Sequence, residues 1–267
     1  MSDIYLYCIR DNTGIDLDMK IRGIDGKNIV YQIIYKDLAA IVSGIDPGIF
    51  NMEEIQKKAK DDLQWIKEKA VAHERVIEEV MKTESGVIDL IPMRFGAVFK
   101  GKISLKKCLK KDYAEFRKFL DKIRNRQEWS VKAYLGDGKK LEQIIIDKNR
   151  TSEKKDEESK PIPEGLAFFM EEELKDNMIS EKDKEISLIA GEIFAGFNSL
   201  AEDSSENKVL NKALTGKAEP MISNTAYLID SEKTGHFKDY AETLNNKVKE
   251  KGFYLEYSGP WPAYSFL

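Results

Sequence analysis

The spacing of hydrophobic residues in the first half of the chain predicts strands and two long amphipathic helices. Apolar, β-rich runs predict strands at residues 4–9, 28–34, 38–43 and 87–91. The first run is apolar on both faces, which is typical of a central strand, and the next two are spaced as a hairpin. Apolar residues at three- and four-residue steps predict a helix that begins near Met52, with Asn51 as its cap, and ends at Gly86. A second amphipathic helix is predicted over 105–123.

The second half of the chain predicts the same kinds of element in a similar order. Its strands are predicted at residues 129–135, 208–214, 222–229 and 253–257. Helical spacing follows the first of these strands, and further helices are predicted over 186–200 and 237–248, the last ended by Gly252. Residues 147–160 contain no hydrophobic side chain, which predicts a solvated helix end or loop.

This order of elements predicts an α+β fold with two domains. Residues 1–125 predict a modified ferredoxin-like domain, in which a glycine-containing loop replaces the first helix of the β-α-β-β-α-β unit. Residues 126–257 predict a second α+β domain with ferredoxin-like element order and an enlarged first crossover. Residues 258–267 form an aromatic, proline-rich C-terminal tail, which we expect to be docked because large aromatic side chains are unfavourable in water.

Composition and charge exclude several classes of protein. The 43 Lys and Arg against 47 Asp and Glu give a formal net charge of −4 and a pI near 5.6, whereas dedicated nucleic-acid binders are strongly basic. The longest apolar run, at residues 4–9, is far shorter than the ~18 residues of a membrane-spanning helix, and residues 1–3 lack the features of a signal peptide. Cys8 and Cys108 are too few for a disulfide framework. We expect a cytosolic protein with neither nucleic acid nor a membrane as its partner.

The sequence contains no set of residues with the spacing of a catalytic or metal site. Residues 96–103 nearly match a phosphate-binding loop, but Ile103 stands where Ser or Thr would hold Mg²⁺, so we expect a strand end and a turn there. His73 falls on the apolar stripe of the first long helix and is predicted to be a core histidine with a satisfied ring nitrogen. His236 has no partner in the sequence. We therefore predict no cofactor, no bound metal and no catalytic residue.

Two segments place polar or aromatic side chains in unusual surroundings. Arg94 lies among apolar residues in the segment 92–96, and we expect it to be buried and hydrogen-bonded to carbonyls or to a carboxylate such as Glu74. The tail carries Trp261, Tyr264 and Phe266, which we expect to pack against the protein's own body. A partner-binding role for Arg94 or for the tail is the alternative.

Seven segments, distributed over nearly all of the chain, match one known family in order. They are Tyr5-Leu6-Tyr7, Tyr35-x-Asp37-Leu38-Ala39-Ala40-Ile41-Val42-Ser43, His73-Glu74 followed by Val76, Pro92-Met93-Arg94-Phe95-Gly96, Glu128-Trp129-x-Val131-Lys132, Asn224-x-Ala226-Tyr227-Leu228-Ile229 and the ending Ser258-Gly259-Pro260-Trp261-Pro262-x-Tyr264-Ser265-Phe266. On these segments the sequence resembles the gas vesicle protein F/L family (GvpF/GvpL). Each segment alone is weakly specific, whereas their joint order is specific.

The resemblance implies a non-enzymatic accessory protein for the assembly of gas vesicles, the hollow protein-walled compartments that give some prokaryotes buoyancy. It implies binding to the small hydrophobic gas vesicle shell protein and to other gas vesicle accessory proteins, at the gas vesicle within the cytoplasm. A shell subunit with an apolar face would aggregate before incorporation, and an accessory protein can cover that face. Two forms of the role stay open: a minor component retained in the finished vesicle, and a transient chaperone.

Structural or partner-binding roles are expected for the chemically distinctive residues of the matching segments, namely His73, Glu74, Arg94, Phe95, Trp261, Tyr264 and Phe266. The alternative class of protein is an enzyme or a small-ligand-binding sensor built on ferredoxin-like domains, since a fold does not fix a function. Purified protein that retained a nucleotide or a metal would favour that alternative.

Overall fold

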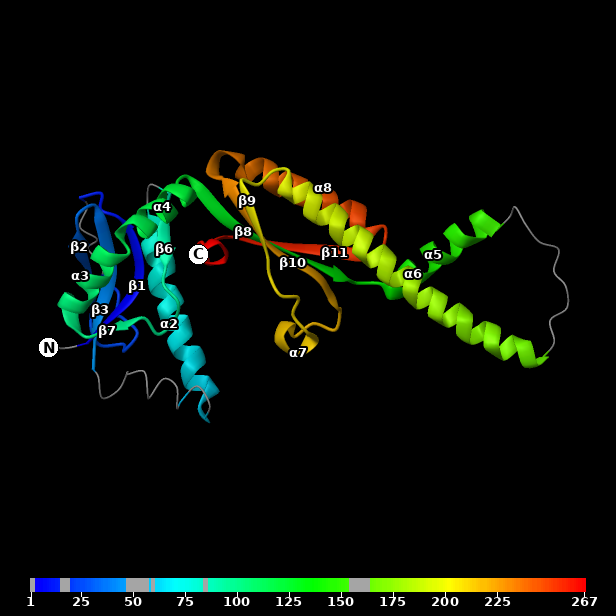
Figure 1. The fold of residues 1–267 in the computed structure, drawn as a ribbon, viewed down its shortest axis with the longest axis horizontal. Helices are drawn as coiled ribbons and strands as arrows, with labels where there is room; N and C mark the ends of the chain where they lie inside the picture. Colours follow the sequence, from blue (N-terminus) through cyan, green and yellow to red (C-terminus); the bar gives the residue numbers. More distant parts are fainter. Residues whose placement is uncertain (1–2, 15–19, 47–57, 59–60, 84–85, 154–163) are drawn as a thin grey trace. The chain divides into compact units, whose positions relative to one another are not determined.

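The structure is a computed structural model, and it describes residues 3–14, 20–46, 58, 61–83, 86–153 and 164–267. For Thr83, Gly86 and residues 150–153 and 164–175 it describes the backbone alone. The chain forms two compact units (Figure 1). Unit 1 comprises residues 1–127 and 261–267, and unit 2 comprises residues 128–260. Each unit combines a sheet with helices, so the predicted α+β class is confirmed.

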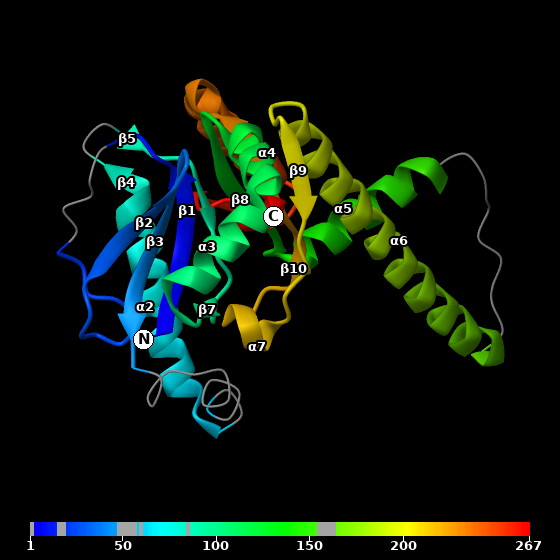
Figure 2. The ribbon, with the colours of Figure 1, turned by 60° about the vertical axis from the view of Figure 1, so that its left-hand side comes forward.

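The sheet of unit 1 is built around a central strand. Its strands are β1 (Asp3–Asp11), β2 (Val30–Tyr35), β3 (Leu38–Ile45), β6 (Leu90–Pro92) and β7 (Val98–Phe99). The order is β2-β3-β1-β6, with β7 also paired to β1, and each of these pairs is antiparallel (Figure 2). The side chains of β1 are buried from Ile4 to Arg10, which confirms the predicted central strand. The hairpin predicted from the next two apolar runs is β2 and β3.

The first long helix, α2 (Leu63–Met81), packs one face against β1. Asp62 caps it, because the Asp62 carboxylate accepts a hydrogen bond from the Trp65 N–H at 2.9 Å. The cap expected at Asn51 lies outside the described residues. The helix ends at Met81 rather than at Gly86, because the chain turns there into a small hairpin of β4 (Lys82–Thr83) and β5 (Gly86–Val87).

The prediction of one helix over residues 105–123 was wrong. The segment forms two helices, α3 (Gly101–Lys111) and α4 (Tyr113–Ile123), with Asp112 between them in a non-helical conformation (φ −101°, ψ 15°). Aspartate interrupts helices because its short side chain competes for local hydrogen bonds, and here the Asp112 carboxylate accepts one from the Cys108 thiol. The buried stripe continues on both pieces, so its period does not reveal the break.

Unit 2 has a four-stranded sheet of β8 (Arg126–Leu135), β9 (Asp203–Glu206), β10 (Met221–Asp230) and β11 (Phe253–Trp261), in the order β11-β8-β10-β9. The strand predicted at 208–214 was wrong. That segment contains a short helix, α7 (Lys212–Thr215), which Asn211 caps by accepting from the Leu214 N–H and which Gly216 ends at φ +68°. The strand lies earlier, at β9, whose polar residues pair with β10.

Helices α5 (Gly138–Glu153), α6 (Glu164–Asn198) and α8 (Thr234–Lys249) pack with the sheet of unit 2 around one core. Helices α6 and α8 run side by side in Figure 1, and both contact β10. The predicted glycine after α8 is confirmed, because Gly252 has φ +90° and an added Cβ would lie 2.5 Å from the Asp137 carbonyl oxygen.

The C-terminal tail is shorter than predicted, because β11 continues through Ser258 to Trp261. The remaining residues belong to unit 1 and end in a 3₁₀ turn over Tyr264–Phe266. Phe266 is only 8% exposed, and Tyr264 packs against the hydrophobic core of unit 1. The expected docking of the tail is therefore observed at these two residues, whereas the Trp261 side chain is 43% exposed.

Candidate functional site

Two tyrosines of β1 form one wall of a buried polar cluster in unit 1. The register of β1 against β3 shifts between Leu6 and Cys8, yet the Tyr5 and Tyr7 rings lie on the same face of the sheet, where both contact His73 of α2. Their ring centroids lie 4.9 Å apart. The Tyr7 hydroxyl is hydrogen-bonded to the Ser43 hydroxyl at 2.8 Å and accepts from the Ile24 N–H at 2.7 Å. The strand thus places two phenol hydroxyls inside an otherwise apolar core.

His73 of α2 reaches this cluster from the opposite side. It is 1% exposed, and its ring packs edge-on against Tyr5 and is stacked with Tyr7. The Tyr5 hydroxyl lies 3.0 Å from His73 Nδ1, and His73 Nε2 lies 2.9 Å from the Met93 carbonyl oxygen. Both ring nitrogens have partners, which confirms the prediction of a satisfied core histidine.

The partners of His73 determine which of its nitrogens carries the proton. A carbonyl oxygen can only accept, so Nε2 carries the hydrogen and donates to Met93. Nδ1 is then the acceptor, and the Tyr5 hydroxyl donates to it. The same hydroxyl accepts from the Gly96 N–H at 2.9 Å. The lowered pKa of His73 favours this neutral tautomer, in which both ring nitrogens have partners.

The C-terminal tail joins the cluster through Tyr264. The Tyr264 hydroxyl donates to Glu74 Oε1 at 2.8 Å and lies 3.3 Å from His73 Nε2. Tyr264 and Glu74 are 190 positions apart in the sequence. We call the connected group of Tyr5, His73, Glu74 and Tyr264, with the main-chain groups of Met93 and Gly96, the His73 network.

Burial governs the ionisation of the groups in the His73 network. It lowers the pKa of His73 to about 4, against the hydrogen bond to Met93, which favours the charged ring. Burial raises the pKa of Glu74, and the hydrogen bond from Tyr264 opposes that rise. The pKa values of Tyr5 and Tyr264 are raised, chiefly by burial, so both hydroxyls stay protonated and available as donors. These shifts favour a neutral His73 ring and protonated tyrosine hydroxyls at neutral pH.

The segment 92–96 is held by its main chain. Besides the bonds to His73 and Tyr5, the Met93 N–H donates to the Tyr7 carbonyl at 2.8 Å, and the Leu6 N–H donates to the Ala97 carbonyl at 2.9 Å. Gly96 adopts φ +94°, which a side chain would strain. Four hydrogen bonds therefore fix this segment on both sides of Arg94.

The expectation that Arg94 is buried and hydrogen-bonded to carbonyls or to a carboxylate such as Glu74 was wrong. Arg94 is exposed, and among the described residues its side chain makes no hydrogen bond or ion pair. Glu74 bonds to Tyr264 instead. Main-chain hydrogen bonds of Met93 and Gly96 hold the segment without the Arg94 side chain, and in water the guanidinium keeps its hydration. The buried arginine of unit 1 is Arg10, which donates to Gln32 and Thr13.

The remaining candidate residues are divided between the core and the surface. The Phe95 ring packs edge-on against His73, with centroids 6.1 Å apart. Phe266 is buried, and the Lys122 ammonium lies 5.3 Å from its ring centroid. Trp261 ends β11 and is partly exposed. The structure therefore brings together His73, Glu74, Phe95 and Tyr264, and leaves Arg94 and Trp261 in contact with solvent.

Tyr5 and Tyr7 are the members of the cluster that sequence reasoning did not select as site residues. A signal for them was present, because two tyrosines at alternate positions of a buried strand must each find a hydrogen-bond partner. A histidine on the apolar stripe of a helix is the complementary signal. Neither pattern alone says that the strand and the helix meet.

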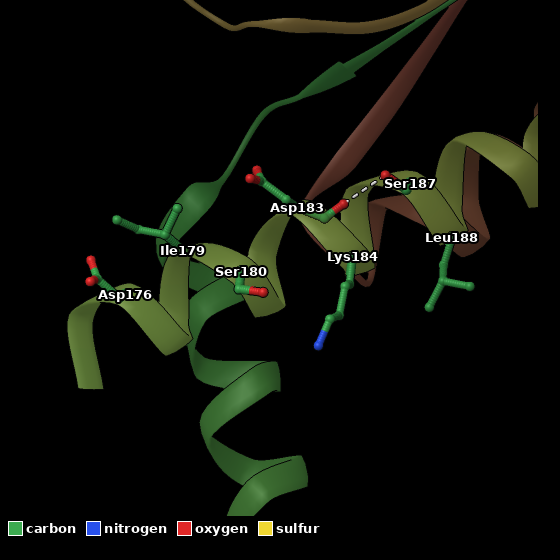
Figure 3. A pocket seen from close by; sticks show the side chains of 7 residues that line it. All are labelled: Asp176, Ile179, Ser180, Asp183, Lys184, Ser187 and Leu188. Atoms are coloured by element: carbon green, nitrogen blue, oxygen red, sulfur yellow. Dashed lines mark hydrogen bonds between the residues drawn. The ribbon is translucent and has the colours of Figure 1, made fainter. Parts of the chain in front are cut away.

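A shallow hollow lies along the surface of α6 in unit 2 (Figure 3). It is lined by Asp176, Ile179, Ser180, Asp183, Lys184, Ser187 and Leu188, all from one helix. The Ser187 hydroxyl donates to the Asp183 carbonyl oxygen within the helix, and the Ile179 and Leu188 side chains are exposed. Small-ligand sites are usually enclosed by several elements with converging polar groups, so this open face gives the sensor alternative no support.

Neither a metal site nor a membrane span is found in the part of the chain that the structure describes. Within the described ranges, no cluster of three or more His, Cys, Asp and Glu side chains could hold a metal ion. Over the same ranges, no helix combines the length and the apolar character needed to cross a bilayer. The near-match to a phosphate-binding loop includes β7 and the start of α3, as a strand end followed by a helix.

The fold and the His73 network define a class of protein: a two-unit α+β chain whose distinctive polar residues hold its first strand, a helix, a loop and its tail together. A family model described as gas vesicle synthesis protein GvpL/GvpF matches residues 3–267. The chain belongs to this family, which confirms the recognition made from the sequence segments. The family is one of gas vesicle proteins rather than of enzymes.

Individual relatives extend over nearly the same length. Gas vesicle protein F1 of Halobacterium salinarum is 26% identical over 265 residues, which cover 99% of this chain and 92% of that protein. Gas vesicle protein F of Nostoc sp. is 26% identical over 272 residues, which cover 99% and 98%. The crystal structure of GvpF from Anabaena sp. has the same fold, with a TM-score of 0.69 and 22% identity over 100% of this chain and 96% of that one. GvpF from Microcystis aeruginosa gives a TM-score of 0.66 at 19% identity, over 100% and 99%.

Proposed function

We propose that this protein is a non-enzymatic accessory factor that binds the small hydrophobic gas vesicle shell protein during vesicle assembly. The observation that carries the proposal is the family match over residues 3–267, which includes every segment of the His73 network. A shell subunit with an apolar face needs to be covered before it is incorporated, because large exposed apolar patches associate. Binding to other gas vesicle accessory proteins and a location at the vesicle within the cytoplasm belong to the same proposal.

The chemistry of the His73 network supports a structural rather than a catalytic use of these residues. Its hydroxyls and ring nitrogens are all directed at one another or at main-chain groups. A nucleophile or a general base must be able to reach a substrate, and His73 is buried. In this proposal His73, Glu74, Phe95, Tyr264 and Phe266 shape unit 1, and Arg94 and Trp261 are the partner-facing candidates.

We also propose that both units are variants of the ferredoxin-like fold. In that fold the fourth strand pairs with the first, the first with the third, and the third with the second. The orders β6-β1-β3-β2 in unit 1 and β11-β8-β10-β9 in unit 2 both agree with this pattern. In unit 1 the segment between β1 and β2 would replace the first helix, and in unit 2 helices α5 and α6 would form an enlarged first crossover.

The direct test is capture of the shell protein. The chain is given an affinity tag and co-expressed with the shell protein of the same gene cluster, and the complex is recovered from the soluble fraction. We expect both proteins in the eluate, and we expect more shell protein in the soluble fraction than with a tagged control protein of similar size and net charge. Recovery of the tagged chain alone, while the shell protein is soluble, would overturn the proposal.

A second experiment separates the two forms of the role. The gene is deleted in its native cluster and restored on a plasmid, and vesicles are counted by electron microscopy. An assembly factor leaves few or no vesicles in the deletion and normal numbers after restoration. Antibody against the chain, applied to washed intact vesicles from the restored strain, then distinguishes a retained minor component from a chaperone that leaves. Normal vesicles in the deletion strain would contradict both forms.

A further inference from the structure

Arg94 differs from the other arginines whose side chains are described, because it makes no hydrogen bond or ion pair with the described residues. Every other arginine whose side chain is described donates to an oxygen of this chain: Arg10, Arg22, Arg75, Arg117, Arg124 and Arg126. Arg94 makes no such contact with the described residues, and it is exposed. Within the described part of the chain, the guanidinium is therefore exposed and makes no hydrogen bond or ion pair.

The backbone that carries Arg94 is fixed before any partner arrives. Met93 is bonded through both its N–H and its carbonyl, to Tyr7 and to His73, at 2.8 and 2.9 Å. On the other side the Gly96 N–H is bonded to Tyr5 at 2.9 Å. A side chain on a pre-ordered loop loses less conformational freedom on binding than one on a loose loop. The buried network thus presents one exposed cation in a defined position.

From this arrangement we propose that Arg94 is an anchor for a carboxylate on the surface of the shell protein. This proposal rests on the proposed function and names its contact. A guanidinium donates two parallel hydrogen bonds to a carboxylate, and arginine is enriched among the residues that dominate interface energies. A nucleic acid is a poorer fit, because it calls for a cluster of cations, whereas the chain has a net charge of −4.

The test compares two charge reversals in the capture experiment with the shell protein. R94E and K106E change the net charge by the same amount, and Lys106 is an exposed residue of α3. Because the Arg94 side chain is exposed and makes no hydrogen bond or ion pair with the described residues, both variants should keep the wild-type melting temperature. We expect R94E to lower the apparent affinity for the shell protein about tenfold or more, as loss of an interface anchor does, and K106E to leave it unchanged. R94K should lie between wild type and R94E, since lysine lacks the planar fork.

A charge swap identifies the partner group. Each Asp and Glu of the shell protein is changed in turn to Lys, and the variant that recovers binding to R94E marks the carboxylate. Equal capture by wild type, R94E and K106E would overturn the Arg94 proposal and leave the proposed function standing. Absence of capture by the wild-type chain would overturn the proposed function, and the Arg94 proposal with it.

Discussion

The cores of the two units are held together by different kinds of contact. In unit 2 the rings of Trp129, Phe197, Tyr227 and Phe237 pack at centroid distances between 5.1 and 6.4 Å, inside a cluster of aliphatic side chains. In unit 1 the face of the sheet that packs on α2 carries Tyr5 and Tyr7, whose hydroxyls are hydrogen-bonded to His73 of α2 and to Ser43. One core depends on buried area, and the other adds directional bonds that fix which segments meet.

This difference has a physical consequence for specificity. Aromatic and aliphatic contacts tolerate small rearrangements, because their energy follows the area removed from water. A buried hydrogen bond that is lost leaves a polar group without water or partner, so only one arrangement satisfies the His73 network. In unit 1 the hydrogen bonds fix the positions of the segment 92–96 and of the C-terminal tail. In unit 2 the long helix α6 packs through apolar contacts.

The largest effect should follow from a cavity in the core of unit 2. Phe237 is fully buried, and Phe237→Ala should lower the free energy of unfolding of unit 2 by about 4 kcal/mol, through lost burial and the cavity left behind. Urea unfolding followed by residue-resolved NMR measures the two units separately. Leu214→Ala is the control, because Leu214 is exposed and its truncation should have little effect. If Phe237→Ala lowered the free energy of unfolding by less than Tyr5→Phe does, buried area would contribute less to unit 2 than these hydrogen bonds contribute to unit 1.

Deletion of one hydroxyl should be the next largest effect, and it falls on unit 1. Tyr5→Phe keeps the ring but removes the donor to His73 Nδ1 and the acceptor of the Gly96 N–H. A buried ring nitrogen and a partly buried N–H lose a partner, so the free energy of unfolding should fall by about 2 kcal/mol. Tyr31→Phe is the matched control, because the Tyr31 hydroxyl makes no hydrogen bond with the described residues. Equal stability of the two variants would mean that the network contributes only packing.

Acid should weaken unit 1 more than unit 2. The pKa of His73 is about 4 in the folded chain and near 6.5 in the unfolded chain, so the unfolded chain binds a proton first as the pH falls. Stability contributed by neutral His73 is therefore full above pH 6.5 and is lost towards pH 4, by about 2 kcal/mol between pH 7 and pH 5. The raised pKa of Glu74 works in the opposite sense, because its folded carboxyl takes up a proton before the unfolded one.

The variant His73→Gln separates this titration from the others. It should be less stable than wild type at pH 7, and its loss of stability from pH 7 to pH 5 should be smaller than that of wild type. Urea midpoints for unit 1 at the two pH values measure both effects. A wild-type midpoint that is unchanged between pH 7 and pH 5, or the same pH dependence in both proteins, would show that His73 is not the titrating group.

The parts of the fold that sequence predicted best were those with a complete apolar pattern. The central strand β1, the hairpin of β2 and β3, and helix α8 all have buried faces that follow the expected period. The strand β9 was missed because Asp203–Glu206 has no apolar pattern, and its structure comes from pairing with β10. The strand expected at 208–214 failed because the cap at Asn211 and the left-handed Gly216 favour a helix turn.

The sequence predicted several residues of the candidate site but not the hydrogen bonds that join them. His73 was placed correctly in the core, because its position on an apolar stripe reports burial. Its contacts come from Tyr5, 68 positions away, and from Tyr264, which no local pattern can pair. The burial of Arg94 was predicted wrongly for a related reason. Apolar neighbours in the sequence do not show whether a segment is fixed by hydrogen bonds of its main chain or of its side chains.

The smallest loss of stability is expected at Tyr264, and it tests how much the tail contributes to the His73 network. Tyr264→Phe removes the donor to Glu74 but keeps the ring, and water can reach the partly buried carboxylate, so the loss should be only about 1 kcal/mol. The pKa of Glu74 should rise further, since the Tyr264 hydroxyl is the group that lowers it against burial. An NMR titration of the Glu74 carboxyl measures this shift, and Tyr257→Phe, whose hydroxyl donates to the carboxylate of Glu242 on the surface of unit 2, is the control. A loss as large as that of Tyr5→Phe would place the tail among the main determinants of unit 1, whereas an unchanged pKa of Glu74 would mean that the Tyr264 hydroxyl does not bond to this carboxylate.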